Sequence, residues 1–176
     1  MQSNRVLAGV ALCAFMTFPA TAAPEDFHPG TVIEDYADIA SVVDERLTSE
    51  SSFAVAYDVA GAGPDDAPNR SFVTPARFLN MHVDAGVPLE NIKLAVVVHG
   101  GAYKDLLTEE TRGAPNPNAD LIARLVAKGV RFELCGQTAA HYDVTDEDLL
   151  PGVTISLSAM TSHALLQQEG YTLNPF

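Results

Sequence analysis

The sequence has few cationic residues and no tryptophan, and each shortage argues against a class of function. Its 10 Lys and Arg residues stand against 23 Asp and Glu, which gives a net charge of −13 at pH 7. Such an acidic surface repels nucleic-acid phosphates and anionic lipid headgroups, so we expect neither nucleic acid nor, once the leader described below is removed, a membrane among the partners. Aromatic residues make up only 7% of the chain, which disfavours a surface that stacks against sugars.

Short motifs of several enzyme classes are absent as well. The sequence contains no Gly-x-Ser-x-Gly turn of a serine hydrolase, no Gly-x-Gly-x-x-Gly dinucleotide fingerprint and no Walker loop. It has no Cys-x-x-Cys or His-x-x-x-His spacing typical of zinc sites. We therefore expect no cofactor and no metal. A metal bound by Cys135, His99 and His141 is the open alternative.

Residues 1–22 have the layout of a secretory signal peptide. Arg5 precedes an apolar run over residues 6–18, and Ala20-Thr21-Ala22 supplies an Ala-x-Ala cleavage site. The apolar run is shorter than the roughly 20 residues that a membrane span needs. We expect cleavage after Ala22 and a periplasmic mature protein.

The rest of the chain divides into an acidic N-terminal segment, residues 23–51, and one domain, residues 52–176. In the segment, the spacing of Ile39, Val42, Val43 and Leu47 predicts a short amphipathic helix, or an arm that packs on a neighbour. In the domain, apolar patterning predicts strands at residues 51–60, 92–101, 130–137, 153–158 and 171–176. Helices are predicted at residues 74–86, 116–129, 144–152 and 158–170, the first of them capped by Thr74. This alternation predicts a three-layer α/β sandwich with a mostly parallel sheet.

Two of the predicted strands end in residues that can carry chemistry. One ends in His99-Gly100-Gly101 and the other in Cys135-Gly136-Gln137. Ligands of open α/β sheets bind outside the carboxyl ends of the strands, so His99 and Cys135 face one crevice if the strands are neighbours. Asn116 and His141 are candidate rim residues of this crevice, whereas His163, beside two leucines of a predicted helix, is expected to be structural.

Cys135 is the only thiol that remains if the leader and its Cys13 are removed. The glycine after it allows a close backbone approach or a positive φ. The N–H groups of Gly136 and Gln137 could then point at a thiolate, and such donors lower a thiol pKa and make the sulfur nucleophilic. Packing in the core, an intermolecular disulfide and metal binding are the other roles that the residues leave open for Cys135.

From about Ser52 to Phe176 the chain resembles the DsrE/DsrF-like family, including its YchN-type branch. The resemblance is carried by KLAVVVHGGA, by NPNADLIARLVAKGVRFELCGQT and by LLPGVTISLSAMTSHALLQQEGY. It implies a five-stranded α/β fold, assembly into trimers, hexamers or hetero-assemblies, and a cysteine that carries sulfur as a persulfide at the position of Cys135. The export leader and the acidic segment depart from the best-known members of the family.

The expected function is therefore that of an exported sulfur carrier, in which His99 and the Gly136 and Gln137 backbone tune the Cys135 thiolate. Its partners would be a thiol or persulfide donor and acceptor, either a protein or a small sulfur compound, and the chain would form a homo-oligomer, a trimer or hexamer. Whether it turns over as a sulfurtransferase stays open. The alternative is a non-enzymatic module that binds a small ligand or a partner in the same crevice, with Cys135 only packed.

Overall fold

The computed structural model describes residues 23–175. The predicted signal peptide, residues 1–22, lies outside these residues. The centre of the fold is a parallel sheet with strand order β6-β5-β4-β3-β7. Its strands are β3 (Phe53–Val59), β4 (Ile92–Val98), β5 (Arg131–Cys135), β6 (Val153–Ser156) and β7 (Thr172–Asn174).

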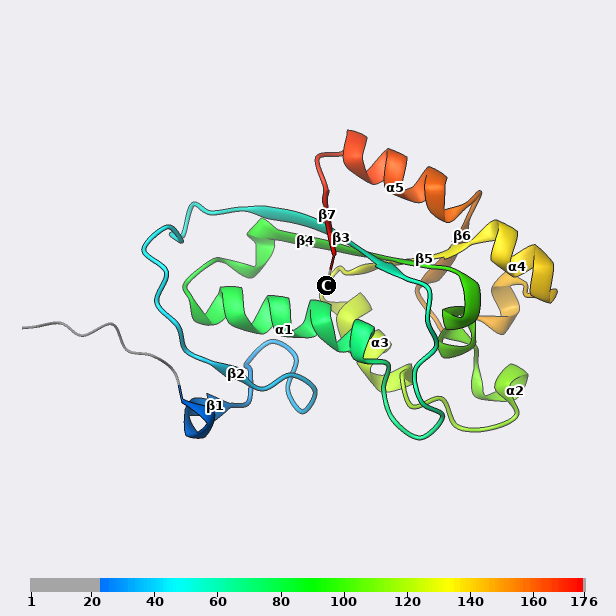
Figure 1. Cartoon of the computed structure of the whole chain (residues 1–176), viewed down its shortest axis with the longest axis horizontal. Helices are drawn as coiled ribbons and strands as arrows, with labels where there is room; N and C mark the ends of the chain where they lie inside the picture. The colour runs from blue at the N-terminus through cyan, green and yellow to red at the C-terminus, as the bar shows by residue number, and fades with distance from the viewer. Residues whose placement is uncertain (1–22, 176) are drawn as a thin grey trace, which may run out of the picture.

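Helices cover both faces of this sheet, which makes three layers (Figure 1). The helices α1 (Arg70–Asp84) and α3 (Ala119–Ala127) lie on one face, and α5 (Ala159–Gln168) lies on the other. Two short helices, α2 (Glu109–Arg112) and α4 (Gly136–Tyr142), complete the set, with 3-10 turns at Pro24–Asp26, Leu89–Asn91, Gly100–Leu106 and Asp146–Asp148. The predicted three-layer α/β sandwich with a mostly parallel sheet is confirmed, and all strand pairs of this five-stranded sheet are parallel. No helix in the described part of the chain is long and apolar enough to span a membrane.

The two faces of the sheet differ in the size of their side chains. Toward α1 and α3, β-branched, leucine and aromatic residues form the main core, in which the rings of Phe72 and Phe132 meet edge to face at 5.7 Å. Each such ring contributes roughly 1.5–3 kcal/mol when fully buried. Toward α5 the packing is of small residues, with Ala56, Ala95 and Val97 beneath Leu166.

The N-cap of α1 lies five residues earlier than the predicted cap, Thr74. Asn69 is the N-cap, and its side-chain oxygen accepts a hydrogen bond from the Ser71 N–H at 2.9 Å. Asn69 is itself held in place, because its Nδ2 donates to Asp105 Oδ2 at 2.7 Å. Because this bond joins residues that are far apart in the sequence, local spacing does not reveal it. The helix therefore starts earlier than predicted, and Pro75 lies inside it.

The amphipathic helix predicted from the spacing of Ile39, Val42, Val43 and Leu47 is wrong, since residues 39–47 contain no helix. The segment instead forms an antiparallel pair, β1 (Phe27–His28) with β2 (Ile39–Ala40), followed by a loop. Asn80 of α1 holds this segment: its Oδ1 accepts from the N–H groups of Val32 and Ile33, and its Nδ2 donates to the carbonyls of Ile33 and Ala37. Four hydrogen bonds from one buried amide fix an irregular path that apolar spacing alone does not predict.

Candidate active site

The carboxyl ends of β3, β4 and β5 bring the candidate residues together. Val98 pairs with Leu134 in the parallel ladder, so His99 and Cys135 follow at the same level of neighbouring strands. On the α5 side of the sheet they line an open cavity of about 300 Å³, at the lower end of the ~300–1,000 Å³ range of small-molecule sites. The residues that line this cavity are Asp58, His99, Cys135, Gln137, Thr138, Ser158, Ala159, Met160 and His163.

Cys135 ends β5 and is the N-cap of α4. Its side chain is mostly buried, and burial raises the pKa of a thiol because it disfavours the charged form. Hydrogen bonds from the Ala159 N–H, from the Thr138 N–H and hydroxyl and from the Gln137 N–H outweigh that effect and lower the pKa of Cys135 below its ordinary value. These donors belong to the first turns of α4 and α5, so the sulfur lies between two helix N-termini.

Gly136 is required by the close approach of the strand beside it. A Cβ at this position would lie 2.3 Å from the carbonyl oxygen of Ser156 and 3.1 Å from that of Leu157. Its φ is not positive, so of the two reasons that the sequence suggests for the glycine, close approach is the one that applies. The glycine thus lets the α4 backbone turn against β6 and present its N–H groups to the sulfur.

Asp58 of β3 joins two imidazoles in the same cavity. Its Oδ2 lies 3.2 Å from His99 Nε2, and its Oδ1 lies 2.8 Å from His163 Nε2 of α5. Burial raises the pKa of Asp58, but the hydrogen bonds from His163 and His99 lower it by more, so the pKa lies below its ordinary value. The group is therefore a carboxylate at neutral pH with an imidazole on each oxygen.

The turn after β4 fixes His99 from the backbone. The His99 N–H donates to the carbonyl of Val59 at 3.0 Å, and the Gly100 N–H donates to Thr138 Oγ1 at 3.1 Å. Gly100 has a φ of +54°, a left-handed conformation that favours glycine. Gly101 follows against the carbonyl of Ala60. Thr138 therefore links the histidine turn to the cysteine, since its hydroxyl bonds to both.

Gln137 lies in the cavity wall, and its Nε2 donates to the carbonyl of Leu157 at 3.2 Å. The structure places the remaining two candidates elsewhere. Asn116 is buried, and its Nδ2 donates hydrogen bonds to the carbonyls of Asp105 and Leu107. These bonds hold the loop between β4 and α3 in place. His141 lies in the last turn of α4, where its ring meets Tyr142 edge-on.

Sequence reasoning missed Asp58, Thr138 and His163. Asp58 had a signal, because it is the one charged residue of an otherwise apolar strand and lies near its carboxyl end. His163 had none, since its role depends on α5 crossing back over β3. The two leucines of its helix do not share its environment: Leu166 is buried against the sheet, whereas Leu165 is half exposed.

A metal set of Cys135, His99 and His141 does not form, because His141 lies outside the cavity. Within residues 23–175, no group of three or more His, Cys, Asp or Glu side chains is arranged to hold a metal ion.

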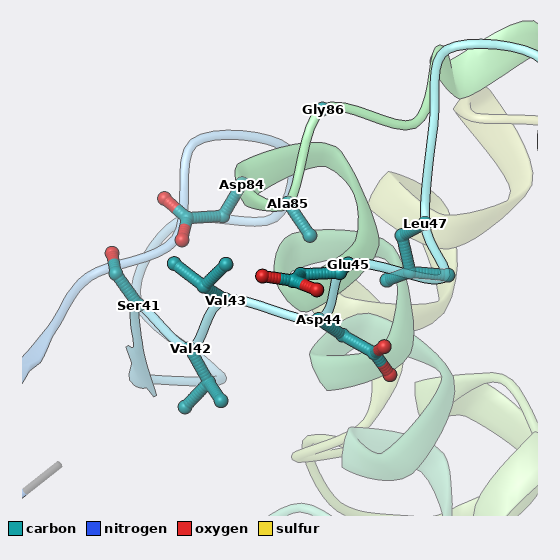
Figure 2. Close-up of a pocket in the computed structure, with 9 residues that line it drawn as sticks. All are labelled: Ser41, Val42, Val43, Asp44, Glu45, Leu47, Asp84, Ala85 and Gly86. Atoms are coloured by element: carbon teal, nitrogen blue, oxygen red, sulfur yellow. The ribbon is translucent and has the colours of Figure 1, made fainter. Parts of the chain in front are cut away.

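A second hollow, of about 440 Å³, lies between residues 41–47 and the end of α1 (Figure 2). Its polar lining is mostly acidic, with Asp44, Glu45 and Asp84. In Figure 2 the side chains of Val42 and Asp44 point away from Ala85 and Gly86, so the hollow is a shallow space under a loop. It contains neither a thiol nor a histidine, unlike the cavity at Cys135.

Comparisons with known proteins agree with this fold. Two solved structures are similar over their full lengths. One is a protein of unknown function, MTH1491, from Methanobacterium thermoautotrophicum, with a TM-score of 0.52 and 22% identity over 71% of this chain and 100% of its own. The other is the ychN protein from E. coli, with a TM-score of 0.50 and 17% identity over 70% of this chain and 100% of its own. At these identities the likeness concerns the fold alone.

No curated protein matches the sequence significantly. The model of the DsrE/DsrF-like family matches residues 56–175, which is more than half of the chain and includes every residue that lines the cavity. The protein therefore belongs to the DsrE/DsrF-like family.

Proposed function

We propose that the protein is a sulfur carrier that holds sulfane sulfur as a persulfide on Cys135. The observation that carries this proposal is the environment of the sulfur: a thiol with a lowered pKa in a cavity, between the N-termini of α4 and α5. A thiolate is the nucleophilic form of cysteine, and these donors favour it. Membership of the DsrE/DsrF-like family supports the same reading.

Loading needs no cofactor. The Cys135 thiolate attacks the outer sulfur of a donor persulfide R–S–SH, the donor S–S bond breaks, R–S⁻ leaves, and Cys135–S–SH forms. One sulfane sulfur changes carrier, and no net oxidation occurs. A lone cysteine suits this step, because a neighbouring thiol would convert the persulfide into a disulfide.

The proposal includes a periplasmic location after cleavage at Ala22, and a homo-oligomer, a trimer or hexamer. Exposed apolar side chains support assembly: Leu157, just before α5, is 70% exposed and Met160, in the first turn of α5, is 81% exposed, while Leu165 and Leu173 are half exposed. Solvent-exposed side chains of this size are covered in many oligomers. Sedimentation of the mature chain tests this part: a monomer at micromolar concentration would contradict it.

The alternative function, a binding module with an inert cysteine, is favoured by one observation: Cys135 is only 7% exposed. Alkylation separates the two functions. A carrier thiol should react with iodoacetamide in the folded protein near neutral pH, whereas a packed thiol should react only after denaturation.

The direct test of the carrier function is cyanolysis. Wild type, Cys135→Ser and the control His141→Ala, which lies outside the cavity, are incubated with polysulfide, desalted and treated with cyanide. We expect thiocyanate from wild type and from the control but none from Cys135→Ser. Equal yields from all three would overturn the proposal.

A further inference from the structure

The imidazoles of His99 and His163 line the cavity, but the loading step does not require them. The Cys135 thiolate is stabilised by backbone N–H groups and a hydroxyl, so loading needs no base. The titratable groups that face the cavity are Asp58, His99, Cys135 and His163. The histidine side chains are 33% and 17% exposed respectively, so both are within reach of a molecule in the cavity.

Asp58 decides which nitrogen of each imidazole carries the proton. A carboxylate only accepts hydrogen bonds, so the Nε2 atoms of His99 and His163, at 3.2 Å and 2.8 Å, must both donate to it. A neutral imidazole that donates through Nε2 has its lone pair on Nδ1. Among residues 23–175, neither Nδ1 atom has a hydrogen-bond partner. The pair therefore offers proton-accepting nitrogens on two residues that line the same cavity as Cys135.

We propose that sulfur is transferred from Cys135 to an acceptor thiol that arrives protonated. His99 or His163 removes the proton of that thiol. Asp58 is the positioning residue that holds both imidazoles in the accepting tautomer. This inference rests on the proposed function and names its acceptor class: an alkyl thiol, of a protein or a small molecule, that arrives uncharged.

The step balances without a further reactant. The acceptor R–SH gives its proton to Nδ1, and R–S⁻ attacks the outer sulfur of Cys135–S–SH. The Cys135 S–S bond breaks, its electron pair stays on Sγ, and R–S–SH leaves. The imidazolium then releases the proton to solvent. The N–H groups that stabilise the Cys135 thiolate make it a good leaving group, because a thiol of lower pKa leaves faster.

Charge favours an uncharged acceptor. The cavity already holds the Asp58 carboxylate, transfer creates a second anion on Cys135, and the whole chain carries a net charge of −13. A free thiolate would approach against these charges. A thiol that is deprotonated only inside the cavity avoids this repulsion, which is the function that we assign to the imidazole pair.

The test compares two small acceptor thiols with protein loaded by polysulfide, at about pH 8, where an alkyl thiol of ordinary pKa is mostly protonated. The first is 2-mercaptoethanol, which is mostly protonated, and the second is 2,2,2-trifluoroethanethiol, which is mostly ionised. The release rate is measured per loaded Cys135, so that a difference in loading between variants does not affect the comparison. The variants are Asp58→Asn and His163→Gln. Asp66→Asn is the control, since it removes the same charge from an exposed position away from the cavity.

We expect Asp58→Asn to slow release to 2-mercaptoethanol on the order of 100-fold, the usual contribution of a general base. Release to trifluoroethanethiol should change by less than about threefold, because that thiol needs no base. His163→Gln should show the same selectivity with a smaller loss, and Asp66→Asn should match wild type. Equal slowing with both thiols, or no slowing in either variant, would overturn this inference while leaving the carrier function intact. A wild type that takes up no sulfur would overturn both.

Discussion

His163 Nε2 lies 2.8 Å from Asp58 Oδ1, although the two residues are 105 positions apart in the sequence. The contact joins α5 to the carboxyl end of β3, and the other Asp58 oxygen meets His99 of the β4 turn. One carboxylate thus connects three elements around the cysteine cavity. The ionisation of Asp58 should therefore affect the free energy of unfolding as well as the chemistry of the cavity.

We expect the stabilising effect of Asp58 to depend on pH in acid. Its pKa is lower in the folded protein than in the unfolded chain, where it is about 3.9, because the two histidines hydrogen bond to the charged form. A lowered pKa means stability that is fully present above about pH 4 and is lost as pH falls through the folded pKa. Since the side chain is 42% exposed, the effect should be under about 1 kcal/mol.

Urea unfolding of wild type and Asp58→Asn over a pH series measures this dependence. The difference in free energy of unfolding between the two proteins should shrink as the pH falls below about 4. A difference that grows in acid would contradict the assigned direction of the pKa shift.

Gly136→Ala should destabilise the protein by roughly 1–3 kcal/mol or more, because the added Cβ would lie 2.3 Å from the Ser156 carbonyl oxygen. The backbone shift that relieves this clash should also move N–H groups away from Cys135. Chemical denaturation measures the stability. Gly61→Ala is the matched control: nothing lies within 4 Å of its Cβ position, so it should leave stability within about 0.5 kcal/mol of wild type. Equal effects of both substitutions would refute the close-approach explanation.

Asn80→Ala should release the N-terminal segment from α1. It removes all four hydrogen bonds that the buried amide makes to the backbone of residues 32–37, and each buried backbone group left unsatisfied costs about 1–3 kcal/mol. Amide hydrogen exchange should accelerate over residues 31–40 and remain slow in the sheet. Asn91→Ala, whose amide makes only longer bonds of 3.2 and 3.3 Å to the carbonyls of Ser49 and Ser51, should have a much smaller effect. Unchanged exchange in Asn80→Ala would show that the segment is held by other contacts.

The pKa of the Cys135 thiol should lie below its ordinary value, because the N–H groups and the Thr138 hydroxyl favour its charged form. The rate of alkylation as a function of pH gives the midpoint. Thr138→Ala removes one donor and should move the midpoint upward. His141→Ala, outside the cavity, should leave it in place. A midpoint that does not respond to Thr138→Ala would mean that the hydroxyl does not bind the thiolate.

The sequence carried enough information for the layers of this fold but not for its irregular parts. The apolar run of β4 and the amphipathic stripe of α3 predict their elements because burial on two faces or on one face leaves a periodic pattern. The N-terminal segment and the start of α1 were mispredicted because Asn80 and Asn69 fix them through bonds to residues distant in the sequence. Such bonds leave no local periodicity.

The candidate site also contains residues that the sequence predicts and features that it does not. His99 and Cys135 were predictable because each directly follows a strand, and the carboxyl ends of parallel strands meet at one edge. The turn of α4 was not predicted, since Gly136 disfavours a helix and its fit against Ser156 shows only in three dimensions. Asn116 and His141 are close to the site along the chain but not in space.

Intact-protein mass spectrometry shows whether Cys135 takes up sulfur as a persulfide. The mature chain, wild type and Cys135→Ala, is incubated with polysulfide, freed of excess reagent and weighed without reduction. We expect a species heavier by about 32 Da, the mass of one sulfur atom, in wild type alone, and we expect this species to disappear on addition of an acceptor thiol. An unmodified wild type, or the same adduct on Cys135→Ala, would contradict a sulfur carrier that acts through Cys135.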